Sequence, residues 1–193
     1  MKKSLTILFL VLSTTVFAQT FQLGVKGGVN ISNFNGGDFN TIKNKALLGY
    51  HVGGFLRLRY GHFAIQPAVL LSTQGATLEN AGNEQDYKIT YVNVPVLLQY
   101  QTDGGFYLEA GPQLGFKVDE DVPNSTIGDF AKSTDLSVAF GLGYFSKIGL
   151  GVGARYNVGV SKVGDFDSNT IDPDFRNGVI QFSVFYSIFG NKK

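Results

Sequence analysis

The sequence has 193 residues, of which 44% are apolar and 16% are charged, and it contains no cysteine. The 16 Lys and Arg residues nearly balance the 15 Asp and Glu residues, so no strong field would attract nucleic acid. The lack of cysteine excludes disulfides, thiol catalysis and cysteine-ligated zinc. The charged share lies below the roughly 25% of ordinary soluble domains, while Gly, Phe and Tyr are abundant.

Residues 1–18 are typical of a secretory signal peptide. Lys2 and Lys3 precede an apolar run, residues 5–12, and Ala18 ends a Val-Phe-Ala sequence that suits cleavage. This run is shorter than the roughly 20 residues that a membrane-spanning helix needs. We therefore expect residues 1–18 to direct export and residues 19–193 to form one mature domain.

The rest of the chain alternates between apolar and polar residues with a period of two, which indicates β-strands. On each segment the apolar face carries no charge, whereas the other face consists of Gly, Ser, Asn, Gln and a few charged residues. Eight segments show this pattern, and they cover residues 21–31, 48–60, 63–72, 91–100, 106–117, 135–144, 150–161 and 180–188.

The composition of the two faces predicts which one is inside. A solvated face would carry many Lys and Glu residues, so the small polar residues are expected to line an interior and the apolar face to meet lipid. A charge at the bilayer midplane costs about 2–4 kcal/mol on a barrel's outer face. A sheet in lipid must also close, because unpaired backbone groups cost several kcal/mol in hydrocarbon. The sequence therefore predicts an all-β fold, an eight-stranded antiparallel up-and-down transmembrane β-barrel. The alternative is a soluble secreted ligand-binding barrel.

The connections support the membrane interpretation. Short turns are expected around residues 60–62, 101–105 and 146–148, and longer connections at 32–46, 76–86, 119–133 and 162–175. Short and long connections alternate, as in outer-membrane barrels with short periplasmic turns and long extracellular loops. The predicted location is the cell outer membrane, with both termini on the periplasmic side.

Aromatic residues on the apolar face gather at the short-turn ends of the strands. Tyr and Phe prefer the lipid–water boundary, so they predict a periplasmic aromatic girdle. Its members are Phe21, Tyr60, Phe63, Tyr100, Phe106, Tyr144 and Tyr186.

Four segments resemble the PorT-like outer-membrane β-barrel family of Bacteroidota: Phe21–Phe34, Tyr91–Tyr100 (YVNVPVLLQY), Phe106–Phe116 (FYLEAGPQLGF) and Gly149–Val158. The resemblance covers essentially the whole mature chain. It implies an eight-stranded barrel of OmpA or OmpX size in the outer membrane. Some relatives are associated with protein secretion and gliding, which makes a component of an envelope secretion system one alternative function. The chain departs from the usual barrel ending, because Phe189 is followed by Gly-Asn-Lys-Lys.

Charged and titratable residues on the polar face predict an interior network. Because buried charges must pair, we expect Glu109 to pair with Arg57, joined by Lys26 or Arg155. Eight strands enclose a space that side chains can fill, so a plugged interior is predicted and a small passive pore is the alternative. The predicted network consists of Lys26, His51, Arg57, Arg59, Glu109, Lys117, Asp135 and Arg155.

Acidic residues concentrate in the third and fourth long connections. Such a rim suits divalent cations that bridge lipopolysaccharide phosphates, or a basic partner, and solubility explains it equally well. Loops on a rigid scaffold are where function usually varies. These residues are Asp119, Glu120, Asp121, Asp129, Asp165, Asp167, Asp172 and Asp174.

Catalysis is not expected. The two histidines are His51, which points inward and away from lipid, and His62, which lies in a turn, so neither suits a serine hydrolase acting on lipid. No cofactor and no metal centre are expected. The sequence predicts a monomer in contact with outer-membrane lipid and lipopolysaccharide. It would act as a structural or interaction protein, with an envelope or extracellular protein as a possible partner and no nucleic acid.

Overall fold

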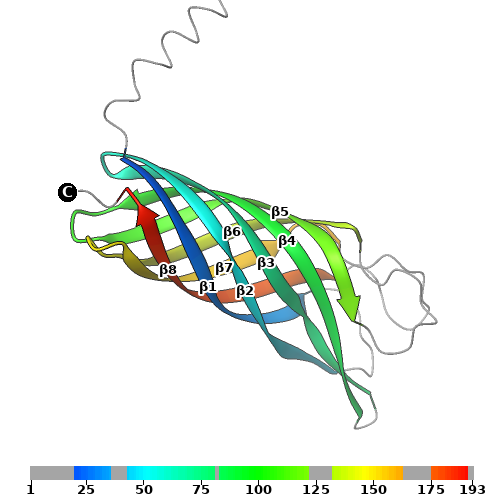
Figure 1. Ribbon diagram of the computed structural model, residues 1–193. Coiled ribbons are helices and arrows are strands. Elements are labelled where there is room, and N and C mark those ends of the chain that lie inside the picture. Colours follow the sequence, from blue (N-terminus) through cyan, green and yellow to red (C-terminus); the bar gives the residue numbers. More distant parts are fainter. Residues whose placement is uncertain (1–19, 36–42, 81–82, 122–131, 163–174, 191–193) are drawn as a thin grey trace, which may run out of the picture.

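The computed structural model describes residues 20–35, 43–80, 83–121, 132–162 and 175–190. Each strand pairs antiparallel with the next one in sequence, and β8 pairs with β1, so the sheet closes into a barrel (Figure 1). Within these residues, no helix is long and apolar enough to cross a membrane. The strands are β1 (Thr20–Asn35), β2 (Lys43–Tyr60), β3 (Phe63–Asn80), β4 (Asn83–Gln101), β5 (Phe106–Asp121), β6 (Thr134–Phe145), β7 (Leu150–Gly159) and β8 (Arg176–Phe189).

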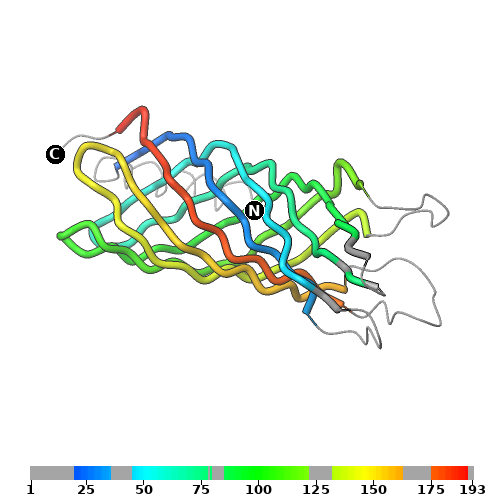
Figure 2. Tube along the Cα trace, turned by 90° about the horizontal axis from the view of Figure 1, so that it is seen from below, coloured from blue at the N-terminus to red at the C-terminus, as the bar shows by residue number. Residues whose placement is uncertain are grey.

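The tight turns and the two ends of the sheet lie at one end of the cylinder. Figures 1 and 2 show the start of β1 (blue) and the end of β8 (red) beside the short connections β2–β3, β4–β5 and β6–β7. Each of these three turns contains a glycine with positive φ, a conformation that L-residues rarely adopt: Gly61 (57°), Gly105 (94°) and Gly149 (89°). We refer to this end, which the sequence predicts to face the periplasm, as the periplasmic end and to the opposite end as the outer end.

The faces of the strands are arranged as the membrane interpretation predicts. Neighbouring positions alternate sharply: Lys26 is 4% exposed, whereas Val184 on the apolar face is 57% exposed. Leu108, Val152 and Phe182 also point outward. Soluble monomers rarely expose contiguous apolar patches above a few hundred Å². The arrangement therefore argues against the soluble ligand-binding barrel, whose apolar face would point inward.

Several strands run further than predicted at the outer end. The predicted long connection 76–86 is wrong, because β3 and β4 continue as a paired hairpin up to Asn80 and Asn83. β5 likewise continues to Asp121, so the predicted start of a loop at Asp119 is wrong too. Beyond the membrane both faces of a strand meet water, so the alternation of apolar and polar residues that reveals a strand disappears there.

The interior contains an aromatic layer that the polar pattern did not predict. Rings from four strands meet close to the periplasmic end: Phe145 stacks on Phe185 with centroids 5.3 Å apart, and Phe55 meets Phe185 edge-on at 5.8 Å. Tyr107 completes the layer. Inward-facing glycines make room for it, since a Cβ on Gly151 would lie 2.3 Å from the Phe185 ring.

A second apolar contact lies toward the outer end. The rings of Phe34, on β1, and Phe175, just before β8, lie 4.5 Å apart between centroids, and both side chains are buried. Leu47 and Ile89 are buried on neighbouring strands. The polar interior thus lies between two apolar regions, the aromatic layer and the Phe34–Phe175 pair.

Candidate functional site

The centre of the interior is an ion pair between β5 and β7. Arg155 Nε donates to Glu109 Oε1 at 2.8 Å, with side chains that are 5% and 3% exposed. Between them on β6 lies Gly141, which is the register partner of both residues. A Cβ on Gly141 would lie 2.9 Å from Glu109 Oε1, so the glycine leaves the space in which the two charges meet.

Arg57 does not pair with Glu109, which corrects the prediction. Its three guanidinium nitrogens donate, each at 2.7 Å, to the side-chain oxygens of Gln22, Gln99 and Gln101. Gln99 in turn donates to Glu109 Oε2 at 2.8 Å, so one glutamine connects the guanidinium to the carboxylate. The Arg57 guanidinium also lies 5.0 Å above the Phe145 ring. The Arg57 guanidinium is therefore stabilised by amide oxygens and an aromatic face, and not by direct contact with the Glu109 carboxylate as predicted.

Lys26 lies beside this pair without bonding to it. Its ammonium group is buried, lies 5.2 Å from the centroid of the Phe185 ring, and is within electrostatic range of both Glu109 and Arg155. Together with Arg57 and Arg155, Lys26 gives the central region more positive than negative charge.

His51 belongs to a separate hydrogen-bonded chain. Asn30 Nδ2 donates to the backbone oxygens of Tyr50 (3.0 Å) and Thr73 (2.9 Å), which fixes the orientation of the carboxamide and turns its Oδ1 toward His51. His51 Nδ1 lies 2.7 Å from that oxygen and must therefore carry the proton. In the neutral ring, Nε2 then accepts the hydroxyl of Ser183 at 2.9 Å.

This serine–histidine–amide order is also that of hydrolytic triads, but its surroundings do not suit acyl transfer. A serine nucleophile needs free donors for the oxyanion. Ser183 instead faces Gly28 and Gly153 in the ladders with β1 and β7, and the aromatic layer separates it from the periplasmic end. We interpret the chain as a clamp that ties β8 to β1, β2 and β3.

The remaining predicted network residues lie at the two mouths of the barrel. Arg59 is partly exposed at the periplasmic mouth and donates to Gly61 O at 2.8 Å. At the outer mouth Lys117 pairs with Glu120 at 2.8 Å, and Asp135 is buried and accepts a bond from Ser161 Oγ at 3.2 Å. Four of the eight predicted residues, Lys26, Arg57, Glu109 and Arg155, thus lie together in the interior, whereas the other four lie apart from them.

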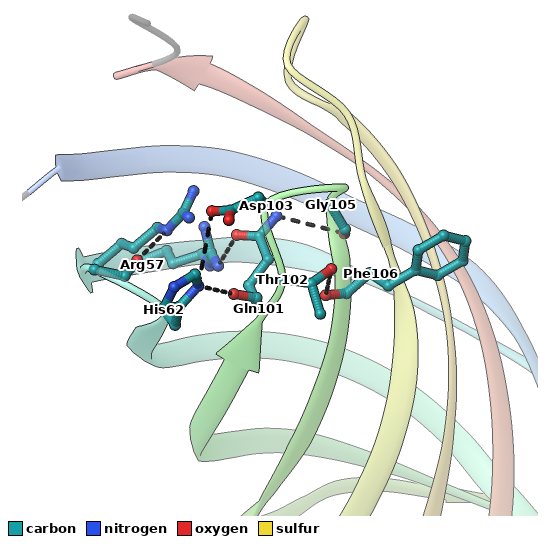
Figure 3. A network of polar contacts seen from close by, with 9 residues as sticks. Arg57, His62, Gln101, Thr102, Asp103, Gly105 and Phe106 are labelled. Carbon is teal, nitrogen blue, oxygen red and sulfur yellow. Dashed lines mark hydrogen bonds and ion pairs between the residues drawn. The ribbon is translucent and has the colours of Figure 1, made fainter.

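The periplasmic mouth holds an open cavity of about 780 Å³. Gln22, Gln101 and Phe145 contribute to its lining, with Arg57 directly below them, and Arg59 and Lys147 contribute positive charge. Figure 3 shows Arg57 and Gln101 next to the β4–β5 turn, where His62 Nδ1 lies 3.0 Å from Gln101 O and 3.8 Å from Asp103 Oδ1.

The seven aromatic residues of the predicted girdle are all exposed on the outer face near the periplasmic end. Neighbouring members touch: Phe63 and Tyr100 have centroids 5.3 Å apart, and Phe106 and Tyr144 have centroids 5.2 Å apart. This position is the one that aromatic residues take at a lipid–water boundary.

The predicted acidic loops are only partly described. Asp119, Glu120 and Asp121 belong to β5; Asp119 and Asp121 are exposed, and Glu120 pairs with Lys117. The other members, Asp129, Asp165, Asp167, Asp172 and Asp174, lie outside the described residues.

A closed eight-stranded barrel with an apolar outer face and a polar, packed interior defines an outer-membrane β-barrel protein. Residues 17–165 match the family model described as "Outer membrane protein beta-barrel domain", and the chain belongs to this family. No curated protein sequence matches the chain.

Solved structures of outer-membrane barrels are similar to this one. Neisserial surface protein A has 17% identical residues and a TM-score of 0.54, with 86% of this chain and 97% of that chain covered. OprG from Pseudomonas aeruginosa has 15% identity and a TM-score of 0.47, covering 87% and 97%. Ail, the attachment invasion locus protein of Yersinia pestis, has 14% identity and a TM-score of 0.46, covering 86% and 98%. At these identities the likeness to Neisserial surface protein A extends to the fold alone.

Proposed function

We propose that this protein is a monomeric, closed barrel that acts as a structural or interaction protein through its outer end, without catalysis. One observation carries the proposal: the interior is filled at successive levels by the aromatic layer, the Glu109–Arg155 pair and the Phe34–Phe175 contact. A barrel sealed in this way offers its surface, and not its lumen, to other molecules.

The outer end supplies a surface of suitable chemistry. The β3–β4 hairpin extends past the register contacts of β4 with β5, which begin at Lys88 and Asp121. The ion pair Lys88–Asp86 (3.3 Å) lies within it, the pair Lys45–Glu79 (2.6 Å) joins it to β2, and exposed acidic residues of β5 lie beside it. Figure 1 shows this hairpin as the longest projection among the labelled strands. We propose that it contacts an envelope or extracellular protein, with lipopolysaccharide around the barrel.

Two further proposals come from the sequence. Residues 1–18 act as the signal peptide that delivers the chain to the outer membrane. Within the outer membrane β-barrel domain family, the chain is a PorT-like member of the type found in Bacteroidota. A role in an envelope secretion system is therefore the second candidate function.

Conductance in planar bilayers tests the sealed interior. The purified protein should give no steady single-channel openings, because the apolar regions at both ends exclude ions. Steady openings of uniform size would contradict the closed interior and support the passive pore. A heat-unfolded sample serves as the control for leakage that is unrelated to the fold.

Site-specific photocrosslinking tests the interaction role. A benzophenone amino acid at Gln85, exposed on the hairpin, should give a discrete protein adduct in the native membrane. The same group at Val184, on the lipid face, is the matched control and should give lipid adducts. Equal protein adducts at both positions, or none at Gln85, would contradict the proposed interaction surface.

A further inference from the structure

Asp135, near the start of β6, is a buried carboxylate without a counter-charge. Its side chain is 4% exposed, and the hydrogen bond that it accepts comes from Ser161 Oγ at 3.2 Å. Among the described residues, no Lys, Arg or His nitrogen lies within ion-pair distance of it. Glu109, the other deeply buried carboxylate, has both Arg155 and Gln99. An unpaired buried charge costs several kcal/mol, so the ionised carboxylate of Asp135 requires a partner.

The polar side chains around Asp135 also lack partners. Asn93 and Asn177 each leave both side-chain atoms without a hydrogen bond, and Gln113 leaves Oε1. All three are buried. The glutamines near the periplasmic end, by contrast, have partners throughout. Buried polar groups in native proteins are nearly always bonded to protein, water or an ion, so these unpaired atoms are available to bind water or an ion.

The geometry brings these groups to one space. Gly115 on β5 is the register partner of Asn93 on β4 and of Asp135 on β6. A Cβ on Gly115 would lie 2.7 Å from Asn93 Oδ1, 3.4 Å from Asp135 Cβ and 3.4 Å from the Tyr91 ring. Asn177, on β8, is separated from β6 by one strand and lies near enough to the Asp135 carboxylate and to Tyr91 to interact with both, although without good hydrogen-bond geometry. A cluster of oxygen donors with one carboxylate therefore lies above the bare face of Gly115.

We propose that this cluster binds a hard cation of the Ca²⁺ class, with the Asp135 carboxylate as the charged ligand. The carboxamide oxygens of Asn93 and Asn177 and the hydroxyl of Ser161 would complete the protein ligands. Ca²⁺ takes six to eight oxygen ligands from carboxylates, amide carbonyls and water, and tolerates irregular geometry. Because a single carboxylate contributes charge, the expected affinity is of the order of 1 mM, at the weak end of the range for calcium sites.

The ligand set also excludes other ions by its chemistry. Thiolate and imidazole, which zinc and copper prefer, are absent from the described residues near Asp135, where the donors are oxygens. Mg²⁺ demands a nearly ideal octahedron and keeps most of its water. The site thus favours the larger, more flexible divalent ion, and it explains why the carboxylate and the amides are buried together.

Terbium luminescence tests the proposal, because Tb³⁺ replaces Ca²⁺ and is excited through nearby tyrosine. The folded full chain in detergent should sensitise Tb³⁺ through Tyr91, whose ring lies beside Gly115 and the proposed ligands, and excess Ca²⁺ should remove the signal. Asp135→Asn should lower the Ca²⁺-displaceable signal at least five-fold. The double variant Asp119→Asn/Asp121→Asn, which changes exposed carboxylates of β5, is the matched control and should retain it. An unchanged signal in Asp135→Asn, or its loss in the control, would overturn the site.

A second variant keeps the test decisive if Asp135→Asn fails to fold. In the native protein, 10 mM Ca²⁺ should raise the midpoint of thermal unfolding relative to a chelator. Asn93→Leu, which removes one ligand and preserves the volume, should abolish that rise. A rise that persists in Asn93→Leu, or one produced by Na⁺ and not by Ca²⁺, would contradict the proposed ligand set.

Discussion

Arg155 and Glu109 meet across an intervening strand, with Arg155 Nε 2.8 Å from Glu109 Oε1 over the bare face of Gly141. Both charges are almost fully buried, so each depends on the other for its solvation. The ion pair therefore connects β5 and β7, the two strands that flank β6, at one level of the barrel.

Glu109→Gln should destabilise the barrel by about 3–5 kcal/mol, because it leaves the guanidinium of Arg155 buried without its carboxylate. Urea titration of the folded fraction in detergent measures the loss. The double variant Glu109→Gln/Arg155→Leu should lose less than the sum of the two single variants, since no charge is then stranded. Strict additivity would show that the two side chains do not depend on each other.

Gly141→Val should also destabilise the barrel, by about 1–3 kcal/mol, because the added atoms compete with Glu109 for the same space. Gly54→Ala is the matched control: a Cβ there has Gly24 O as its nearest neighbour at 3.6 Å, an ordinary contact. Unfolding midpoints of the two variants give the comparison. Equal midpoints would mean that the bare face of Gly141 is not needed.

Replacement of Thr77 should change the titration of Asp86 on the projecting hairpin. The Thr77 hydroxyl donates to Asp86 Oδ1 at 2.7 Å and, with Lys88, holds the pKa of that carboxyl below its ordinary value of 3.8. A lowered pKa means that the contribution of Asp86 to stability is present above pH 3.8 and is lost as the pH falls through the folded value. Thr77→Val should raise the pKa, as measured by NMR titration of the carboxyl.

The control for this titration is Thr90→Val, which changes a threonine of β4 that makes no contact with Asp86. The pKa of Asp86 should stay where it is in that variant. A pKa that is equally high in both variants would assign the shift to the general environment of the hairpin and not to the Thr77 hydroxyl.

Ser183 should behave as a hydrogen-bonding residue and not as a nucleophile. A fluorophosphonate probe, which labels activated serines, should leave the folded protein unmodified. Ser183→Ala should cost about 1 kcal/mol of stability, the typical value of one hydrogen bond. Nitrogen NMR should find the proton of His51 on Nδ1, as the orientation of Asn30 requires. Phosphonylation of Ser183 would show that this serine is nucleophilic. It would contradict the structural role of the hydrogen-bonded chain and support a catalytic one.

The alternation of residues was sufficient to predict the closed barrel, which face of each strand points inward, and the inward direction of Lys26, Glu109 and Arg155. It was not sufficient to pair them. Arg57 and Glu109 lie at similar heights above their turns, which is why the sequence predicted that they pair. Height along the barrel does not give the position around it, however, and β3 and β4 separate the strands of these two residues. Gln99, on one of those intervening strands, makes the connection.

The sequence also concealed features that depend on uncharged residues. The role of Asn30 follows from its contacts with two backbone carbonyls, which no pattern along the chain reveals. The aromatic layer arises because inward-facing rings such as Phe185 lie opposite glycines on other strands, a relationship set by strand register. The outer hairpin was missed because strands outside the bilayer carry no apolar face.

The Phe34–Phe175 contact and the aromatic layer lie toward opposite ends of the polar interior. In the proposed closed barrel, a truncation at one end should therefore leave the apolar side chains at the other end in place, and the variant should remain impermeable to ions. An engineered nanopore would require both sets of side chains to be replaced in the same molecule.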